Sequence, residues 1–285
     1  MWGWLRRWRL MVPPPPRSRL GLGWRPEIAG LIAELPGLRF CEVIAESLTG
    51  GTPPPALTAL RERGVVVIPH GVTLSLGGAE PVAPSRIAHL VACARRLDAP
   101  LVSEHIAFVR AGGMEAGHLL PVPRSRESLD VLVRHVRQVQ DCLPVPLALE
   151  PIAALFDWPD DEFTEAEFLI ELLGRTEAWL LLDVANVYAN AVNGGTDPGA
   201  LLAQMPLERV AYVHVAGGTE RDGLYHDTHT HATPPEVLAL LTELCTRHPP
   251  PAIMLERDGA YPPAGELHAE LDAVADAASV DRITP

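Results

Sequence analysis

The sequence predicts an α/β fold, a (β/α)8 TIM barrel. Short apolar runs alternate with helix-like segments along most of the 285 residues, and eight such strands over about 250 residues match the size and order of this barrel. The run from Ala178 to Leu182 is apolar throughout, which is typical of a strand buried on both faces. A doubly wound open sheet is the alternative, but Gly21-Leu-Gly23-Trp-Arg25 is a poor match to a Gly-rich phosphate turn.

The expected strands are the eight apolar runs of strand length. In chain order they are Leu20 to Trp24, Phe40 to Ala45, Val65 to Pro69, Pro100 to Ser103, Pro146 to Leu149, Ala178 to Leu182, Arg209 to Val213, and Ala252 to Leu255. Helical patterns lie between them at Ser85 to Leu97, Ser125 to Cys142, Thr164 to Arg175, and Pro235 to His248. Thr164 and Glu167 have the spacing of a capping box, which predicts that a helix begins there. Pro198, Pro234 and Pro235 lie where the first turn of a helix tolerates proline.

The N-terminal residues 1–18 lack the alternation of strands and helices that is predicted for the rest of the chain. Arginines interrupt the apolar residues from Met1 to Val12, so no apolar core of signal-peptide length is present. The run from Pro13 to Pro16 stiffens the chain as an extended linker. We expect residues 1–18 to form a disordered or extended N-terminal segment and residues 19–285 to form a single TIM-barrel catalytic domain.

Composition narrows the class of protein. The formal net charge of -13 argues against a nucleic-acid binder, because such proteins neutralise phosphates with Lys and Arg. No window approaches the roughly 18 consecutive apolar residues of a membrane span. The four cysteines are spread widely without a C-x-x-C pair, which predicts reduced core thiols in a cytoplasmic protein.

Carboxylates and imidazoles stand at the predicted strand ends from the third strand onward. In chain order these are His70, Glu104, His105, Glu150, Asp183 with Asn186, His214 and Glu256, and a loop before the last strand adds His226, Asp227, His229 and His231. Taken singly, a His or Glu at a strand end is more often a hydrogen-bonded structural residue than a ligand. Barrel enzymes place their chemistry at the C-terminal strand ends, so these side chains can converge on one mouth.

Their convergence predicts bound metal. Two carboxylates about 4 Å apart repel by roughly 4 kcal/mol at an effective dielectric of 20. Glu150, Asp183, Asp227 and Glu256 around one cavity would therefore strain the fold unless cations neutralised them. The surplus of candidate ligands indicates two or three ions that share carboxylates. No cysteine is among the candidates, which disfavours a closed structural zinc site, while iron, manganese and catalytic zinc are all compatible.

Several motifs together resemble one enzyme family. They are Pro69-His-Gly-Val-Thr-Leu-Ser-Leu-Gly77, Ser103-Glu-His105, Leu181-Leu-Asp-Val-Ala-Asn-Val-Tyr188 followed by Asn193 and Asp197-Pro198, Val213-His-Val-Ala-Gly217, Asp227-Thr-His229 and Leu255-Glu256. Over roughly residues 20–262 the chain resembles the multinuclear non-haem iron-dependent oxidative enzymes (MNIO), domain-of-unknown-function family 692, which includes relatives of the methanobactin-biosynthesis oxidase. That family is similar in fold to xylose isomerase and to the metal-dependent apurinic endonucleases.

The resemblance implies a cluster of two or three iron ions, mixed Fe(II)/Fe(III), with dioxygen as co-substrate. The implied ligands are Glu150, Asp183, His214 and Glu256 for one ion, His70 and His105 with bridging Glu150 for a second, and Asn186, Asp227 and His229 for a weaker third. The implied catalytic residues are His70, Glu150, Asp183 and His214. The implied activity is oxidation of a Cys, Asn or Asp residue in a ribosomally synthesised precursor peptide, commonly with a partner protein that binds the leader peptide.

The chain also departs from the family pattern. Polar residues that usually accompany the ligands are replaced by Glu46, Pro151, Ala185 and Gly218. Such residues tune metal affinity and activity. Two alternatives therefore stay open: a zinc- or manganese-dependent hydrolase or isomerase, either an endonuclease-like phosphodiesterase or a sugar isomerase, and a metal-binding scaffold without catalysis.

Three further residues have weaker signals near the mouth. Arg25 follows the first strand and reads as an ordinary charge on the rim. Glu42 and Glu46 lie on the same side of the second strand if it is extended, so one of them could hydrogen-bond to His70.

Overall fold

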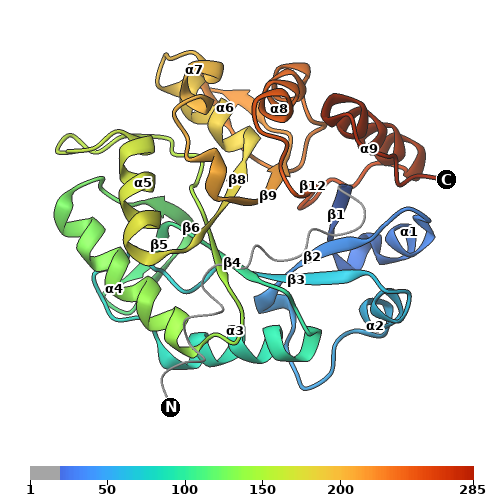
Figure 1. Cartoon of the computed structure of the whole chain (residues 1–285), viewed down its shortest axis with the longest axis horizontal. Coiled ribbons are helices and arrows are strands. Elements are labelled where there is room, and N and C mark those ends of the chain that lie inside the picture. The colour runs from blue at the N-terminus through green and yellow to red at the C-terminus, as the bar shows by residue number, and fades with distance from the viewer. Residues whose placement is uncertain (1–19) are drawn as a thin grey trace.

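Eight parallel strands close into a barrel in the computed structural model, which describes residues 20–285 (Figure 1). The barrel strands are β1 (Leu20–Trp24), β2 (Phe40–Ile44), β3 (Val66–Gly71), β4 (Val102–His105), β7 (Leu147–Glu150), β8 (Trp179–Asp183), β9 (Val210–Val215) and β12 (Ile253–Leu255). They follow one another around the barrel in chain order, and β12 pairs with β1 to close it. The predicted (β/α)8 fold is confirmed, with every expected strand within two residues of its observed bounds. The expected extended segment at residues 1–18 lies outside the described residues.

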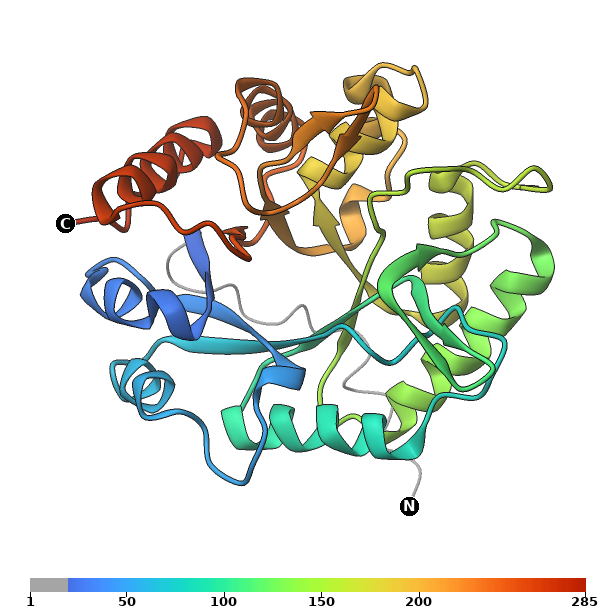
Figure 2. The same cartoon turned by 180° about the vertical axis from the view of Figure 1, so that it is seen from behind.

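Helices surround this barrel (Figure 2). They are α1 (Ala29–Glu34), α2 (Pro55–Glu62), α3 (Pro84–Leu97), α4 (Arg126–Cys142), α5 (Glu165–Thr176), α6 (Val184–Asn193), α7 (Pro198–Leu202), α8 (Pro235–Arg247) and α9 (Ala264–Ala278). The capping box predicted at Thr164 is present, because its hydroxyl accepts from the Glu167 amide and the Glu167 carboxylate accepts from the Thr164 amide. Pro198 and Pro235 lie in the first turns of α7 and α8, as expected.

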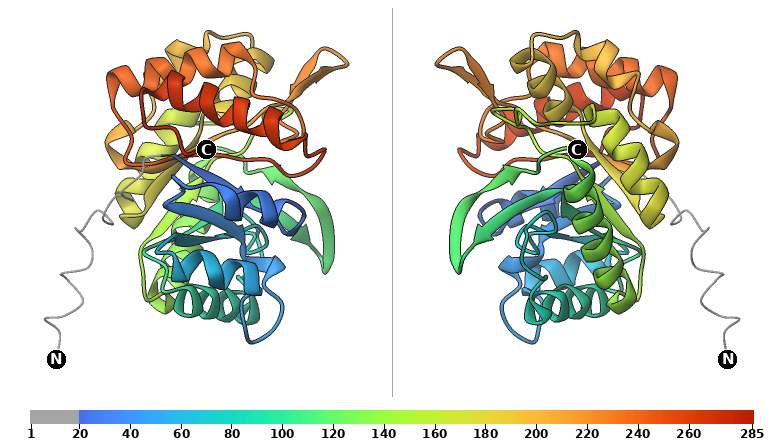
Figure 3. Two further views of the ribbon diagram at one scale, coloured as in Figure 1. Left: turned by 90° about the vertical axis from the view of Figure 1, so that its right-hand side faces the viewer. Right: turned by 90° about the vertical axis from the view of Figure 1, so that its left-hand side faces the viewer.

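Two antiparallel hairpins interrupt the alternation of strands and helices. One consists of β5 (Ala107–Ala111) and β6 (Met114–Pro121), and the other of β10 (Thr219–Arg221) and β11 (Leu224–His226). Both leave the barrel from C-terminal strand ends and project to the same side of the molecule (Figure 3). Neither hairpin was predicted, although Asp222 and Gly223, both at positive φ, form the Asp-Gly turn that favours a hairpin.

The barrel interior is layered. Toward the N-terminal strand ends it is filled by an apolar cluster around Phe40, Leu181 and Met254. Residues two positions further along a strand point to the same side, so the next layer toward the mouth contains polar residues such as Asp183 and Glu256. Gly21 leaves room for this packing, because a Cβ on it would lie 2.6 Å from the Phe40 ring. The apolar layer therefore seals the barrel beneath the polar mouth.

The cysteines follow the prediction in part. Cys41 and Cys93 are buried free thiols, as expected of core residues. Cys142 is exposed, so the expectation of a core position is wrong for it. It is the last residue of α4, where the helix has turned its final side chain away from the barrel.

Candidate metal centre

Six ionisable side chains meet at the mouth of the barrel. Each lies at or next to the C-terminal end of its strand and is at most 9% exposed. They are His70 on β3, His105 on β4, Glu150 on β7, Asp183 on β8, His214 on β9 and Glu256 directly after β12. The parallel strand register brings them to one level, since β7 pairs His105 with Glu150 and β8 pairs Asp183 with His214.

Glu150 lies at the centre of this group. Its Oε2 is 3.2 Å from His105 Nε2 and 3.5 Å from His70 Nε2, while its Oε1 is 3.2 Å from His214 Nδ1. The same His214 nitrogen lies 2.9 Å from Glu256 Oε2. One carboxylate therefore faces three imidazoles through both of its oxygens.

The loop between β11 and α8 adds His229 and Asp227 to the group. His229 Nε2 lies 2.5 Å from Asp227 Oδ2, and its Nδ1 lies 3.5 Å from Glu256 Oε2. His229 Nδ1 is also 3.2 Å from Asp258 Oδ2, a contact that was not expected from the sequence. Of the flanking histidines, His231 bonds to Thr228 on the exposed side of the loop.

Asp183 and Asn186 are held in place by the start of α6. Asp183 is the N-cap of this helix, where its Oδ1 accepts hydrogen bonds from the amides of Ala185 and Asn186 at 2.6 and 3.1 Å. Asn186 Nδ2 donates to the Pro151 carbonyl at 3.1 Å, which fixes which end of the amide faces the centre. These bonds leave Asp183 Oδ2 and Asn186 Oδ1 free on the inner side.

Crowding of charges shifts the pKa values of the group. Burial, reinforced by the charge of Asp227, raises the pKa of Asp183 to about 7. Burial alone would lower the pKa of His105. The negative charges of Glu150 and Glu104 outweigh the effect of burial, so the pKa of His105 is raised to about 9. The pKa of Glu256 is held well below its usual range, against the effect of burial, by His214, His229 and Arg25.

The donor atoms fit divalent metal. Among residues 20–285, three buried oxygen atoms of this group have no hydrogen-bond partner: Asp183 Oδ2, Asn186 Oδ1 and Asp227 Oδ1. An unpartnered buried polar atom costs about 1–3 kcal/mol, so three in one place indicate an occupant. Among the described residues, four sets of donors lie within 4.8 Å of one another: His70, His105 and Glu150; Glu42, His214 and Glu256; Glu150, Asp183 and His214; and Asp183, His229 and Glu256. Carboxylate and imidazole donors of this kind suit transition-metal ions.

Arg25 is part of the centre rather than of the rim. Its side chain is 9% exposed, and Nη2 donates to Glu256 Oε1 at 2.8 Å while Nε donates to Asp258 at 2.8 Å. The rim interpretation was wrong because Gly23, which precedes Arg25 on the inner face, leaves the space that the guanidinium fills. Arg25 thereby orients one candidate ligand directly and His229 through Asp258.

Glu42 and Glu46 do not reach His70. Glu42 Oε2 lies 3.0 Å from His214 Nε2 and 2.5 Å from the Tyr212 hydroxyl. Glu46 accepts hydrogen bonds from the Val72 amide and the Thr73 hydroxyl at 3.1 and 2.6 Å. The expected contact fails because His70 Nδ1 is already bonded to Ser103.

One of the family departures, Gly218, has a visible structural reason. Nothing in the structure explains Pro151, whose backbone carbonyl accepts from Asn186 as that of any residue would. At Gly218 a Cβ would lie 2.3 Å from the His226 carbonyl oxygen and 2.6 Å from the Tyr225 ring. No larger residue fits at this position of the present loop.

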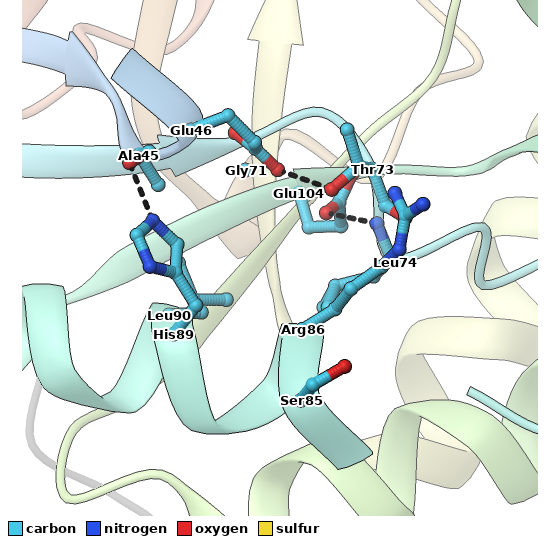
Figure 4. A pocket seen from close by; sticks show the side chains of 10 residues that line it. All are labelled: Ala45, Glu46, Gly71, Thr73, Leu74, Ser85, Arg86, His89, Leu90 and Glu104. Atoms are coloured by element: carbon cyan, nitrogen blue, oxygen red, sulfur yellow. Dashed lines mark hydrogen bonds between the residues drawn. The ribbon is translucent and has the colours of Figure 1, made fainter. Parts of the chain in front are cut away.

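A cavity of about 280 Å³ lies behind the centre, between the barrel and α3 (Figure 4). Its lining includes Glu46, Glu104 and His89. The two carboxylates are engaged with the loop after β3, since Glu104 accepts from the Leu74 amide at 3.0 Å. His89 Nε2 is bonded to the Ala45 carbonyl. The cavity is thus separate from the unpartnered donors of the centre, and its acids support the loop that follows His70.

Comparison with known proteins places the chain in a family. The family model described as "RiPP precursor modification enzyme MbnB/TglH/ChrH" matches residues 19–279. A UPF0276 protein of Streptomyces avermitilis is 53% identical over 261 residues, which are 89% of this chain but only 54% of that longer protein. A UPF0276 protein of Caulobacter vibrioides is 38% identical, and the match covers 90% of this chain and 93% of that protein.

Solved structures share the fold. Endonuclease IV from Thermus thermophilus superposes with a TM-score of 0.61 at 18% identity, covering 90% of this chain and 99% of that one. A xylose isomerase domain protein from Planctomyces limnophilus has a TM-score of 0.53 at 14% identity, covering 93% and 96%. These likenesses establish the xylose isomerase-like barrel. Within residues 20–285, no helix combines the length and apolarity that crossing a membrane requires.

Proposed function

The chain belongs to the MbnB/TglH/ChrH family of RiPP precursor modification enzymes, and from this premise we propose that it is a multinuclear non-haem iron oxidase. It uses dioxygen to modify a Cys, Asn or Asp residue of a ribosomally synthesised precursor peptide. The observation that carries the proposal is the buried set of three histidines and three carboxylates with unpartnered donor atoms.

Two or three irons in mixed Fe(II)/Fe(III) state would be held by the clustered donors. His70, His105 and Glu150 would hold one ion, and Asp183, His214 and Glu256 would hold a second together with Glu150. Asn186, Asp227 and His229 would hold a third. The imidazole, carboxylate and amide donors are compatible with iron, manganese and zinc, and iron is the metal that the resemblance to the MNIO enzymes implies. When bound, iron supplies the redox chemistry that activates dioxygen.

The residues around the irons provide binding and orientation. Arg25 and the N-terminus of α6 fix the carboxylates of Glu256 and Asp183. The apolar layer below the centre closes the barrel, so substrate would approach from the C-terminal strand ends, from which both hairpins project. The substrate would be a precursor peptide, and a partner protein that binds the leader peptide could deliver it. Holding the reacting residue beside the centre supplies much of the rate enhancement.

The test begins with anaerobic purification from iron-supplemented cells. We expect two to three irons per chain by elemental analysis, with Mössbauer signals of both oxidation states. Oxygen consumption should then depend on the precursor peptide encoded near the gene, and mass spectrometry should show a changed peptide mass. Glu150→Gln should lose iron and activity, whereas Glu167→Gln, an exposed helix-cap substitution, should retain both.

Other outcomes assign the alternatives. Stoichiometric zinc or manganese with no oxygen consumption would overturn the oxidase proposal in favour of a hydrolase or isomerase. Full iron loading with a bound but unmodified precursor would indicate a metal-binding scaffold without catalysis.

A further inference from the structure

A buried hydrogen-bond chain lies directly beneath the candidate metal centre. It runs from His70 Nδ1 to Ser103 Oγ at 2.8 Å, from Ser103 Oγ to the Tyr212 hydroxyl at 2.7 Å, and from this hydroxyl to Glu42 Oε2 at 2.5 Å. Glu42 Oε2 continues the chain to His214 Nε2 at 3.0 Å. All five side chains are at most 1% exposed, so water does not compete for these bonds.

Each end of the chain engages the nitrogen of a histidine that faces away from the centre. His70 bonds to Ser103 through Nδ1 and faces Glu150 through Nε2. His214 bonds to Glu42 through Nε2 and faces Glu150 and Glu256 through Nδ1. The chain therefore joins two candidate ligands that belong to different donor sets.

The chemistry of the donors gives the chain a single direction. A carboxylate only accepts hydrogen bonds, so Glu42 Oε2 accepts from both the Tyr212 hydroxyl and His214 Nε2. Tyr212 has one hydroxyl proton, and it is donated to Glu42. In its bond with Ser103, the Tyr212 oxygen must therefore be the acceptor and the Ser103 hydroxyl the donor. Ser103 Oγ in turn accepts from His70 Nδ1. In the neutral form that binds metal, both imidazoles therefore carry their proton on the outer nitrogen and present the unprotonated nitrogen to the centre.

We propose that Glu42, Tyr212 and Ser103 are positioning residues that fix the metal-binding nitrogens of His70 and His214 and couple the two ion positions. This inference deepens the proposed function and rests on the metal centre assigned there. Carboxylates and carbonyls that hold the outer nitrogen of a metal-bound histidine set its tautomer and basicity. Here one carboxylate anchors two histidines, the second through a tyrosine and a serine.

The first test measures metal affinity of the full chain without any oxidation. The protein is stripped of metal and titrated with Zn²⁺ against a competing chelator. We expect Tyr212→Phe, which removes one oxygen and keeps the ring, to weaken Zn²⁺ binding by about 10- to 100-fold. Tyr261→Phe, on the loop after β12, serves as the matched control and should bind as the native chain does. Far-UV circular dichroism verifies that each variant is folded.

The second test reads the histidines directly. In the Zn²⁺-loaded chain with ¹⁵N-labelled histidine, long-range proton–nitrogen spectra should show His70 coordinated through Nε2 and His214 through Nδ1. Tyr212→Phe should shift the signals of both rings, which a change in overall stability would not do selectively. Ser103→Ala should shift His70 more than His214. The double variant should lose little more Zn²⁺ affinity than either single variant, because each substitution alone interrupts the same series of hydrogen bonds.

Native Zn²⁺ affinity and unchanged imidazole signals in Tyr212→Phe would overturn the inference, as would coordination through the opposite nitrogens. Should Tyr212→Phe fail to fold, Ser103→Ala carries the same affinity and spectral criteria with a smaller change. Failure of the peptide oxidation assay with these Zn²⁺ results intact would overturn the proposed function and leave the positioning role standing.

Discussion

Arg25 and Glu256 form a buried ion pair, with Nη2 and Oε1 2.8 Å apart, across the seam where β1 meets β12. The pair joins the first strand of the barrel to the last. It also places a permanent positive charge beside a carboxylate that faces His214 and His229. The arginine thus balances part of the negative charge of the centre whether or not metal is bound.

Replacement of this arginine should destabilise the chain. Arg25→Gln leaves Glu256 and Asp258 without their cation, and removal of one partner of a buried pair costs about 3–5 kcal/mol. We expect the free energy of unfolding, measured by urea denaturation of the metal-free chain, to fall by about that amount. Arg282→Gln breaks an exposed ion pair with Asp276 and should lower the free energy of unfolding far less, because solvent screens exposed pairs. Equal losses in the two variants would contradict the role given to Arg25.

Asp183 has two functions that substitution can separate. Asp183→Asn keeps the oxygen that caps α6, so the chain should stay folded. It replaces Oδ2 with an uncharged amide group, so the chain should lose metal. Asp183→Ala also removes the cap, which should cost about 1 kcal/mol more in unfolding free energy. Asp197→Ala removes the cap of α7 away from the centre and should leave the metal content unchanged. Elemental analysis and thermal unfolding distinguish these outcomes, and full metal content in Asp183→Asn would refute the ligand assignment.

The barrel could be predicted because its strands are locally encoded. Apolar runs such as Ala178 to Leu182 are recognisable without knowledge of their neighbours, and the helices between them carry caps at Ser125 and Thr164. The hairpins were missed because β6 is mostly exposed and lacks apolar alternation. Their glycine turns were present in the sequence but lay outside the regular alternation on which the prediction depended.

The residues of the site that lie at the ends of apolar strands could be predicted from the sequence. His70, Glu150 and Asp183 interrupt or terminate apolar runs, which marks them as unusual. Arg25 could not be assigned, because its partner Glu256 lies 231 positions away in the chain. Tyr212 gave no signal either, since a tyrosine within an apolar strand reads as core. Pairings across the barrel become visible only when the strand register is known.

The metal-free chain should lose stability as the pH rises above neutrality. The pKa of His105 is raised from 6.5 to about 9, so the folded state retains a proton that the unfolded state has released. This proton contributes roughly 3 kcal/mol to the free energy of unfolding. The contribution is fully present below about pH 6.5 and is lost as the pH approaches 9. Urea denaturation at several pH values should show this fall.

Histidine variants and Zn²⁺ binding test the cause of this dependence of stability on pH. His105→Gln should make the fall shallower without abolishing it, because the pKa values of His214 and His229 are also raised. His118→Gln, on exposed β6, should leave the profile unchanged. Metal binding displaces the protons, so Zn²⁺ affinity should rise over the same pH range. A metal-free chain whose stability is constant from pH 6.5 to 9 would contradict the charge balance described for His105.

The loop that carries Asp227 and His229 should be separable from the rest of the centre. It packs against Gly217, whose carbonyl accepts from the His229 amide at 2.9 Å. A Cβ at position 217 would lie 2.2 and 2.3 Å from the carbonyl oxygens of His231 and Ala232, so Gly217→Ala must push the loop away. We expect this variant to bind about one metal ion fewer than the native chain while the His70 and His105 donors remain loaded.

The matched control is Gly30→Ala, because a Cβ there has no neighbour within 4 Å and lies in α1. Its metal content should equal that of the native chain. Loss of all metal in Gly217→Ala would show that the loop supports every ion position, against the assignment of a weaker third ion to it. Unchanged metal content would instead show that Asp227 and His229 are not ligands, since the displaced loop could no longer reach the centre.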